Sequence, residues 1–205
     1  MDWAVRRWDI YAPYYDRFIG FLPQRRRSLE LAQIRPGERI LVCGCGTGLD
    51  LPLLPLGIAI DAVDLSPRMV QQARLKSAGL NIHLQTMDAQ NLKFPDAAFD
   101  VVILHLIVAI VPDPLRALHE AVRVLKPGGR IALFDKYFDG PGQPRLIRRI
   151  LNPIWRAIAT DINTRTLELA REAGLRVVHE EPVLLAGLFR VATLQRQTQS
   201  PATSA

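Results

Sequence analysis

The hydrophobic positions of this chain fall into short apolar runs that are separated by segments with helical spacing. Residues 40–43 and 101–104 are apolar at every position, which is typical of strands buried on both faces of a parallel sheet. The apolar pattern and the turn residues around it predict strands at 40–43, 58–64, 81–86, 99–105, 130–135, 176–180 and 189–195.

Helix signals lie between these strands. Ser66 followed by Pro67 supplies an N-cap and a first-turn proline, and predicts a helix that runs to about residue 78. Asp113 and Pro114 predict the start of another helix, which the Lys-Pro-Gly-Gly run at 126–129 ends. The apolar stripe of that helix consists of Leu115, Leu118, Val122 and Leu125. A further helix is predicted at 164–173. Repeated alternation of strand and helix predicts an α/β fold with a doubly wound sheet.

Length and composition indicate one folded domain. With 205 residues, 49% of them hydrophobic and 22% charged, the chain suits a single α/β domain at 1–196, followed by a flexible tail at 197–205. No apolar run approaches the roughly 20 residues of a membrane-spanning helix, and the first residues lack a signal-peptide pattern, so we expect a cytoplasmic protein. Cys43 and Cys45 are poorly placed to bond to each other and lack two further ligands, so no metal site is expected.

The net charge of +6 and the pI near 9.8 bear on the choice of partner. The basic residues cluster at 25–27 and, later, at Arg145, Arg148, Arg149 and Arg156. Neither cluster has the interleaved aromatics, zinc ligands or helix-turn-helix pattern of a nucleic-acid module, so no specific nucleic-acid binding is expected. The alternatives are a solvated surface and a peripheral contact with anionic lipid at the inner face of the membrane.

A glycine-rich turn, Gly-Cys-Gly-Thr-Gly at 44–48, follows the first strand. Such a turn lets the backbone approach a ligand closely, and nucleotides bind at this edge of a parallel sheet. Leu49 stands where the dinucleotide fingerprint has its third glycine, which disfavours a hydride-transfer enzyme. Asp64 is placed to accept hydrogen bonds from ribose hydroxyls, and Asp88 to meet an adenine amino group. The alternatives are that Asp64 only begins a turn and that Asp88 is a solvated loop residue.

These segments occur in an order and spacing that resemble the class I S-adenosylmethionine-dependent methyltransferases. The segments that carry the resemblance are 40–48, 64–69 (Asp-Leu-Ser-Pro-Arg-Met), 88–89, 99–100 and 125–129. The resemblance implies S-adenosylmethionine as the cofactor and a seven-stranded Rossmann-like sheet, mostly parallel with an antiparallel C-terminal hairpin. It also implies an N-terminal helical lid at 1–30 and a substrate-side insertion at 137–163.

The resemblance further assigns residues to the cofactor site. Those carried over from the motifs are Gly44, Cys45, Gly46, Gly48, Asp64, Leu65, Met69, Asp88, Ala89 and His105. In such relatives an N-terminal tyrosine closes over the methionine carboxylate, which indicates Tyr15 or Tyr11, with aromatic packing as the alternative. Val42 departs from the pattern, because the family usually has Asp or Glu there to help hold the cofactor's ammonium group. Either backbone carbonyls and water take over that role, or the affinity is reduced.

The candidate catalytic residues end the fourth and fifth strands. Methyl transfer from a sulfonium is an in-line displacement, so holding the reactants in line supplies most of the catalysis. An amine acceptor must attack unprotonated, and His105 is the candidate base, with a neutral lining role as the alternative. Asp135 and Lys136 are candidates for binding a zwitterionic or phosphate-bearing acceptor, with a surface ion pair as the alternative.

Three segments resemble a narrower branch, the bacterial phosphatidylethanolamine N-methyltransferases and ubiquinone-type methyltransferases. These are 11–16, 48–52 and 111–114. This second resemblance implies a phospholipid amine as the acceptor. The alternatives are a soluble or quinone-like small molecule, and a cofactor-binding protein without activity. The segment 145–156 mixes Arg with Leu, Ile and Trp, as does a helix at a membrane surface or a helix packed across an active site.

Overall fold

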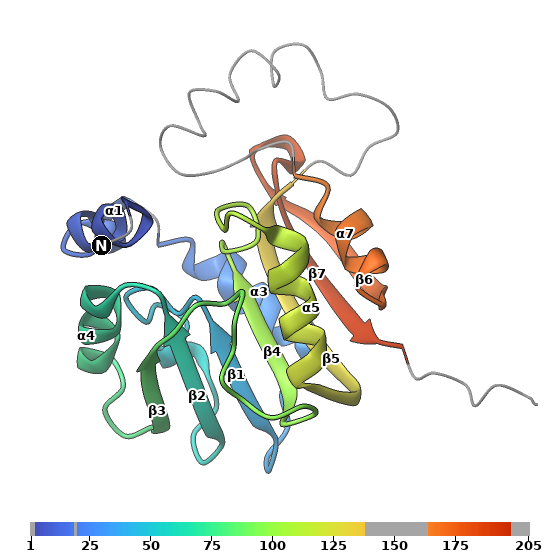
Figure 1. Cartoon of the computed structure of the whole chain (residues 1–205), viewed down its shortest axis with the longest axis horizontal. Helices are drawn as coiled ribbons and strands as arrows, with labels where there is room; N and C mark the ends of the chain where they lie inside the picture. Colours follow the sequence, from blue (N-terminus) through green and yellow to red (C-terminus); the bar gives the residue numbers. More distant parts are fainter. Residues whose placement is uncertain (1–2, 19, 138–163, 198–205) are drawn as a thin grey trace, which may run out of the picture.

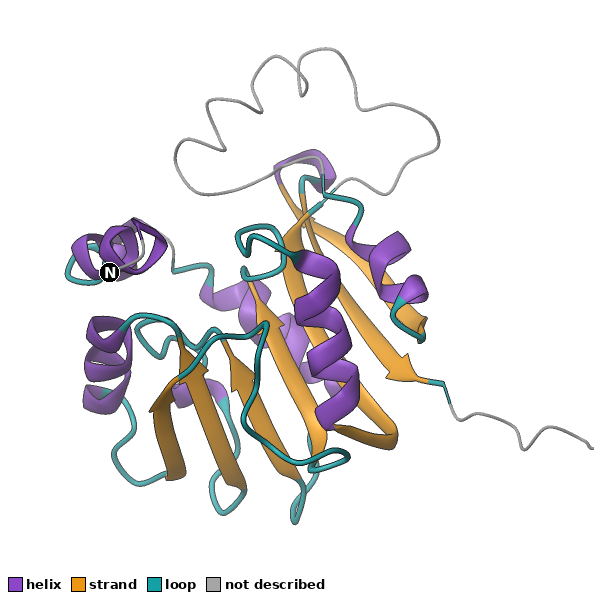
Figure 2. Ribbon diagram, viewed as in Figure 1, coloured by secondary structure: helices purple, strands orange, loops and turns teal. Residues whose placement is uncertain are grey.

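The computed structural model of the chain describes residues 3–18, 20–137 and 164–197. They form a seven-stranded sheet with helices on both faces (Figure 1, Figure 2). The strands are β1 (Arg39–Cys43), β2 (Ala59–Asp64), β3 (Asn81–Thr86), β4 (Phe99–His105), β5 (Leu125–Lys136), β6 (Leu175–Leu184) and β7 (Phe189–Arg196). The α-helices are α1 (Trp3–Tyr11), α2 (Tyr15–Phe18), α3 (Leu22–Ala32), α4 (Pro67–Leu75), α5 (Pro114–Val124) and α7 (Thr166–Glu172), and two short 3₁₀ helices are η1 (Leu51–Leu53) and η2 (Leu185–Gly187).

The strand order is β3-β2-β1-β4-β5-β7-β6. The first five strands along the chain pair in parallel, whereas β7 is antiparallel to both β5 and β6. The expected Rossmann-like methyltransferase topology is thereby confirmed. Because β1 pairs with β2 on one side and with β4 on the other, the turn after β1 lies where the strand order reverses. Ligands of open α/β sheets bind at this point.

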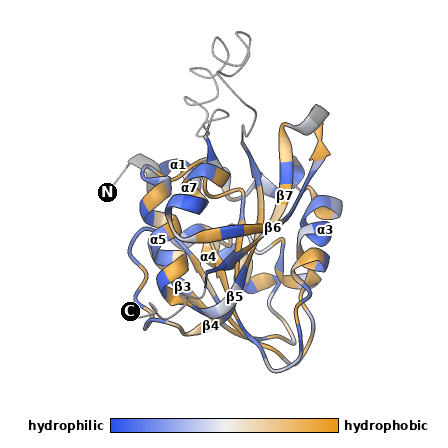
Figure 3. Cartoon of the chain, turned by 90° about the vertical axis from the view of Figure 1, so that its right-hand side faces the viewer, coloured by the Kyte–Doolittle hydropathy of each residue, from blue (hydrophilic) through white to orange (hydrophobic). Residues whose placement is uncertain are grey.

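Apolar side chains pack on both faces of the sheet. One buried cluster joins the strands to α5 and α7, and a second joins them to α3 and α4. Helices α3 and α5 each show both orange and blue in Figure 3, as expected for helices with one face on a sheet and the other in solvent. The continuous apolar runs of β1 and β4 therefore have apolar partners on both sides.

Both predicted N-caps form. The Ser66 hydroxyl accepts a hydrogen bond from Met69 N at 3.1 Å, and the Asp113 carboxylate accepts one from Arg116 N at 3.0 Å. Helix α4 ends at Leu75, about one turn earlier than expected. The buried residues of α5 are Ala117, Leu118, Ala121 and Val124. All four residues of the predicted stripe face the same core: Leu118 and Leu125 are buried in it, and Leu115 and Val122 pack against it, although Leu125 belongs to β5 and not to the helix.

The fifth strand begins earlier than the sequence predicts. Leu125 pairs with Phe99, and after a shift of register Arg130 pairs with Val101. The run at 126–129 therefore lies within the bounds of β5 instead of forming a separate loop, and the pairing of Leu125 with Phe99 precedes the shift. A bulge of this kind admits extra residues into a strand without ending it.

The described residues contain no helix long and apolar enough to cross a membrane. The basic segment 145–156, most of the predicted insertion and all but one residue of the predicted tail lie outside the described residues.

Candidate functional site

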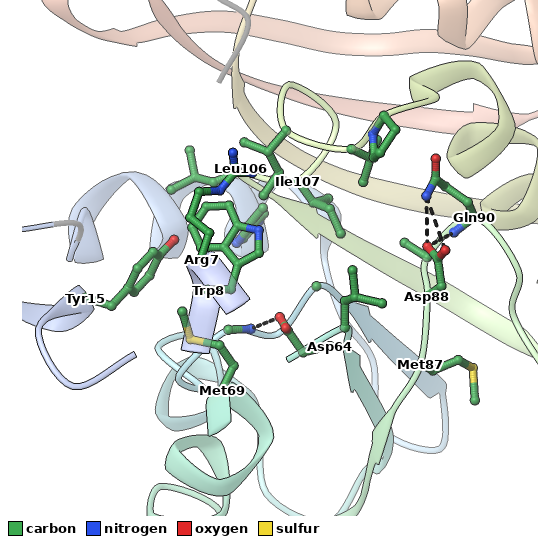
Figure 4. Close-up of a pocket in the computed structure, with 18 residues that line it drawn as sticks. Arg7, Trp8, Tyr15, Asp64, Met69, Met87, Asp88, Gln90, Leu106 and Ile107 are labelled. Atoms are coloured by element: carbon green, nitrogen blue, oxygen red, sulfur yellow. Dashed lines mark hydrogen bonds between the residues drawn. The ribbon is translucent and has the colours of Figure 1, made fainter. Parts of the chain in front are cut away.

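A pocket opens at the carboxyl ends of β1, β2 and β4, between the sheet and the N-terminal helix α1 (Figure 4). Its empty space, including the open mouth, is about 800 Å³. Its lining comprises Arg7, Trp8, Tyr15, Gly44, Gly46, Asp64, Leu65, Met69, Met87, Asp88, Ala89, Gln90, His105, Leu106, Ile107, Ile110, Val111 and Pro112.

The pocket brings together nine of the twelve residues that sequence reasoning assigned to a cofactor. These are Tyr15, Gly44, Gly46, Asp64, Leu65, Met69, Asp88, Ala89 and His105. They come from α2, from the turn after β1, from the ends of β2, β3 and β4, and from helix α4, which carries Met69, although they are far apart in the sequence. The order of the parallel strands is what places them at one edge.

The other three residues do not line the pocket. Tyr11 is 38% exposed and packs edge-on against Trp8, with ring centroids 5.9 Å apart. The Cys45 side chain is buried in the apolar cluster on the α3 face, and burial raises the pKa of its thiol. Gly48 faces helix α4, where an added Cβ would lie 2.8 Å from Ala73 Cα. Cys45 and Gly48 thus pack the turn against the core and against α4, on the side away from the pocket. For Tyr11 the structure agrees with the alternative, aromatic packing.

The carboxylate of Asp64 is fixed by two backbone amides. Gly46 N donates to Oδ2 at 2.8 Å (Figure 4), and Ser66 N, which is not drawn there, donates to Oδ1 at 2.9 Å. Burial raises the pKa of Asp64 to about 6, although both amide bonds act in the opposite direction. Each carboxylate oxygen can accept more than one hydrogen bond, so the ionised group retains acceptor capacity toward the pocket.

The first two amides of the glycine turn are not available to a ligand. Gly44 N and Cys45 N both donate to Val63 O at 2.8 Å, which ties the turn to the end of β2. Gly44 has a φ of 72°, and an added Cβ would lie 2.2 Å from the Ile107 side chain. The glycine here allows the loop after β4 to approach closely, a role different from direct amide donation.

Asp88 is held by the residue that follows Ala89. Its Oδ1 accepts from Gln90 N at 2.9 Å and from the Gln90 side-chain amide at 3.1 Å (Figure 4). The side-chain oxygen of Gln90, Oε1, in turn accepts from Asp113 N at 2.9 Å. The loop after β3 is therefore connected to the start of α5, and Asp88 is oriented in the wall of the pocket.

A buried charged network lies beneath the pocket. Arg25 Nη1 donates to Asp50 Oδ2 at 2.7 Å, and the two side chains are 5% and 2% exposed. His105 Nδ1 lies 2.7 Å from Asp50 Oδ1, and His105 Nε2 lies 3.0 Å from Ser28 Oγ. Burial alone would raise the pKa of Asp50, but the charges of His105 and Arg25 outweigh burial and hold it well below its usual range.

This network changes the interpretation of His105. The residue lines the pocket, but both ring nitrogens contact protein groups and the side chain is only 1% exposed. A base at this position would have to leave Asp50 and Ser28 before it could take a proton. The geometry therefore supports the alternative, a lining residue that is held in place by its neighbours.

Tyr15 connects the network to the pocket. Burial raises the pKa of its phenol to about 12, although the nearby Arg25 guanidinium acts to lower it. Hydrogen bonding to Tyr15 is among the interactions that raise the pKa of Arg25. The phenol is thus protonated at neutral pH and keeps a hydrogen to donate within the pocket.

Asp135 and Lys136 lie at the end of β5, and neither lines the pocket. The Asp135 side chain is fully buried, its carboxylate accepts from Ala109 N at 3.1 Å and Lys136 N at 2.7 Å, and burial raises its pKa. Burial lowers the pKa of Lys136, whose Nζ lies 5.6 Å from the centroid of the Phe189 ring. Leu106, a lining residue, belongs to the same apolar cluster as Phe189. Lys136 therefore lies beside this cluster and outside the pocket lining.

The N-terminal helices are fastened over the site. The Ser66 hydroxyl donates to Asp9 at 2.5 Å, and Lys76 Nζ lies 2.8 Å from Asp16 Oδ2. Figure 1 shows α1 above α4, at the carboxyl edge of the sheet. Two lining residues that sequence reasoning missed, Arg7 and Trp8, come from α1. No motif distinguished them, because their place depends on how α1 docks.

The early basic cluster at 25–27 does not form one basic surface, contrary to the sequence-based expectation. Arg25 is buried in the pair with Asp50. Arg27 points elsewhere, and its Nε donates to Glu181 Oε1 at 2.7 Å. Of the three arginines, Arg26 remains as an exposed residue at which no ion pair is described. A membrane contact would therefore depend mainly on the late cluster.

Comparisons with known proteins agree with this architecture. Residues 41–133 match the methyltransferase domain family. The chain is 29% identical over 199 residues to a phosphatidylethanolamine N-methyltransferase of Cereibacter sphaeroides, a match that covers 95% of this chain and 96% of that protein. It is 30% identical to a demethylmenaquinone methyltransferase of Tropheryma whipplei, over 73% of this chain and 67% of that protein.

A solved structure shares the fold. A chain in the complex of the Haloferax volcanii Trm112 methyltransferase activator with a methyltransferase superposes with a TM-score of 0.74 at 20% identity, covering 93% of this chain and 98% of that chain.

Proposed function

The chain belongs to the class I S-adenosylmethionine-dependent methyltransferases, and we propose that it methylates the amino group of a phospholipid such as phosphatidylethanolamine. The observation that carries this proposal is the similarity to the Cereibacter enzyme, which spans 95% of the chain. The similarity to the quinone methyltransferase spans 73%. Acceptor sites lie largely outside the shared cofactor motifs, so similarity over the whole length bears more directly on the acceptor.

The pocket residues fit S-adenosylmethionine in chemistry. Asp64 offers carboxylate oxygens to ribose hydroxyls, and Asp88 offers them to an adenine amino group. Leu65, Met69 and Ile107 supply apolar surface for the base. Tyr15 supplies a hydroxyl that can donate to the cofactor's carboxylate. We therefore propose these residues as the cofactor site, with Gly44 and Gly46 giving the room for it.

One position does not fit in the usual way. Val42, where the family usually has an acidic residue, is 1% exposed and packs in the apolar cluster on the α3 face. It offers no oxygen to the cofactor's ammonium group. This departure is the observation that favours the second candidate function, a cofactor-binding protein without activity.

The acceptor must be held in line with the methyl group. When bound, the cofactor supplies a methyl group on a positively charged sulfur. The chain's part is to orient the acceptor nitrogen, exclude water and leave that nitrogen unprotonated. We place the acceptor beside the cluster of Leu106, Phe134 and Phe189, with Asp135 and Lys136 at its far side. Because burial lowers the pKa of Lys136, a larger fraction of its amine is unprotonated at a given pH than in an exposed lysine.

The experiment that tests this proposal is a methyl-transfer assay with an acceptor panel, read by mass spectrometry of the products. The panel contains phosphatidylethanolamine in mixed micelles, demethylmenaquinone and ethanolamine. We expect the phospholipid to be methylated fastest. Turnover confined to demethylmenaquinone or ethanolamine would refute the phospholipid acceptor. Binding of S-adenosylmethionine without turnover of any acceptor would favour the inactive alternative.

The role of Lys136 can be separated in the same assay by a matched pair of variants. Lys136→Met removes the amine beside Phe189, whereas Lys126→Met removes one at the other end of β5, where Nζ lies 2.8 Å from Asp100. We expect a loss of turnover in the first variant alone. Equal turnover in both variants would remove Lys136 from the acceptor side.

A further inference from the structure

Arg7 is a charged residue without a partner in the wall of the pocket. It lies on α1 and lines the cavity next to Trp8, whose ring centroid is 5.2 Å from the guanidinium carbon. Its Nε is buried and has no hydrogen-bond partner. Among the residues that the structure describes, none forms a hydrogen bond or ion pair with this guanidinium. Figure 4 shows the side chain among the residues that line the cavity.

The buried Nε of Arg7 is a hydrogen-bond donor that lacks an acceptor. Buried polar groups in folded proteins are nearly always hydrogen-bonded, and exceptions often mark a site where a ligand completes the set. Arginine has five N–H donors in a planar fork that matches a carboxylate or a phosphate. Burial also lowers the pKa of Arg7, which is the expected effect of removing its water without supplying an anion.

The other charged groups of the pocket are already engaged. Asp64 accepts from Gly46 N and Ser66 N, and Asp88 accepts from Gln90. Within the described lining, Arg7 is the one Arg or Lys residue. The guanidinium of Arg7 is therefore the cationic group in this lining that can bind an anionic group of a ligand.

We propose that Arg7 binds an anionic oxygen group of the ligand in this pocket. This inference rests on the proposed function. Two molecules of the reaction can present such a group, namely the cofactor through its carboxylate and the acceptor through a phosphate. Both offer the same paired oxygens to the guanidinium fork, and the two sources are separable by experiment.

The test compares Arg7→Gln with a matched control, Arg6→Gln, which removes an exposed charge from the same helix. S-adenosylhomocysteine is titrated calorimetrically into each protein, followed by 5′-methylthioadenosine, which keeps the nucleoside and lacks the carboxylate. Glycerophosphoethanolamine is then titrated in the presence of saturating S-adenosylhomocysteine. Thermal unfolding midpoints verify that both variants fold.

If the cofactor supplies the anionic group, Arg7→Gln lowers the affinity for S-adenosylhomocysteine at least about tenfold and leaves the affinity for 5′-methylthioadenosine unchanged. If the acceptor supplies the anionic group, Arg7→Gln lowers only the affinity for glycerophosphoethanolamine, by a similar factor. In either case Arg7→Lys recovers part of the affinity, because it keeps the charge and loses the fork.

The inference is overturned if Arg7→Gln and Arg6→Gln bind S-adenosylhomocysteine with equal affinity and also bind glycerophosphoethanolamine with equal affinity. It is likewise overturned if the unaltered protein binds no glycerophosphoethanolamine and Arg7→Gln leaves the affinity for S-adenosylhomocysteine unchanged. Failure of the unaltered protein to bind either nucleoside is a different result. It would refute the proposed function, and this inference with it.

Discussion

Replacing Asp50 by Asn should destabilise the protein more than any exposed charge replacement. The variant keeps the size of the side chain and removes the negative charge that holds Arg25, 2.7 Å away, and faces His105. Both members of the Arg25–Asp50 pair are at most 5% exposed, so water cannot replace the lost anion. Breaking a buried pair by removing one partner typically costs about 3–5 kcal/mol, because an uncompensated charge stays buried.

The size of this loss makes it easy to measure. A domain of this length loses about 2–4 °C of unfolding midpoint per kcal/mol, so the midpoint should fall by about 6–20 °C. Urea denaturation followed by circular dichroism gives the free energy directly. The matched control is Arg27→Gln, which breaks the pair with Glu181, where the side chains are 45% and 28% exposed. Exposed pairs of this kind contribute little.

A second variant separates charge from packing. Arg25→Met combined with Asp50→Leu replaces the pair by apolar groups and should recover much of the stability lost in Asp50→Asn. The reasoning is refuted if Asp50→Asn loses no more stability than Arg27→Gln.

Three further predictions follow from the site and its surroundings. Burial raises the pKa of Asp64 to about 6, and the ionised carboxylate is the better acceptor for ribose hydroxyls. The affinity for S-adenosylhomocysteine should therefore rise as the pH rises through about 6 and level off above it. Asp64→Asn should remove this pH dependence, and an affinity that does not change with pH in the unaltered protein would contradict the prediction. Gly48→Ala should lower the free energy of unfolding, measured by urea denaturation, by about 2–5 kcal/mol, because its φ is +81° and the new Cβ contacts α4. Gly57→Ala, at a φ of +78° with open space around it, should lower the free energy of unfolding by only about 1–2 kcal/mol. Equal losses in the two variants would show that packing against α4 is unimportant. The protein should sediment with anionic liposomes at low salt. Joint replacement of Arg145, Arg148 and Arg149 by Gln should abolish this binding to liposomes and leave cofactor affinity intact. Failure of the unaltered protein to sediment would count against a phospholipid acceptor.

Local signals in the sequence were sufficient for most of the fold. The apolar runs of β1 and β4 and the caps at Ser66 and Asp113 depend on residues close together in the chain, and the structure agrees with each. The start of β5 was missed, since the single pairing of Leu125 with Phe99 depends on a distant strand. Position at a strand end likewise indicated which residues meet at the pocket.

Side-chain direction was not predictable in the same way. The end of β4 brings His105 to the pocket, but its ring turns toward Asp50 and Ser28, which are 55 and 77 residues away in the sequence. Arg25 appears in the sequence as part of a basic run and is in fact a buried ion-pair partner. Arg7 enters the site only because α1 docks over it. These features depend on tertiary packing, which periodicity and spacing do not encode.

We infer that this pocket holds S-adenosylmethionine, with Asp64 on the ribose. The most direct test of this claim is calorimetric titration of S-adenosylhomocysteine into the unaltered protein and into Asp64→Ala. We predict one bound molecule per chain, and a binding free energy weaker by about 1–3 kcal/mol in the variant, the size of a lost charge-assisted hydrogen bond. Absence of binding to the unaltered protein, or equal affinity in the variant, would contradict the claim.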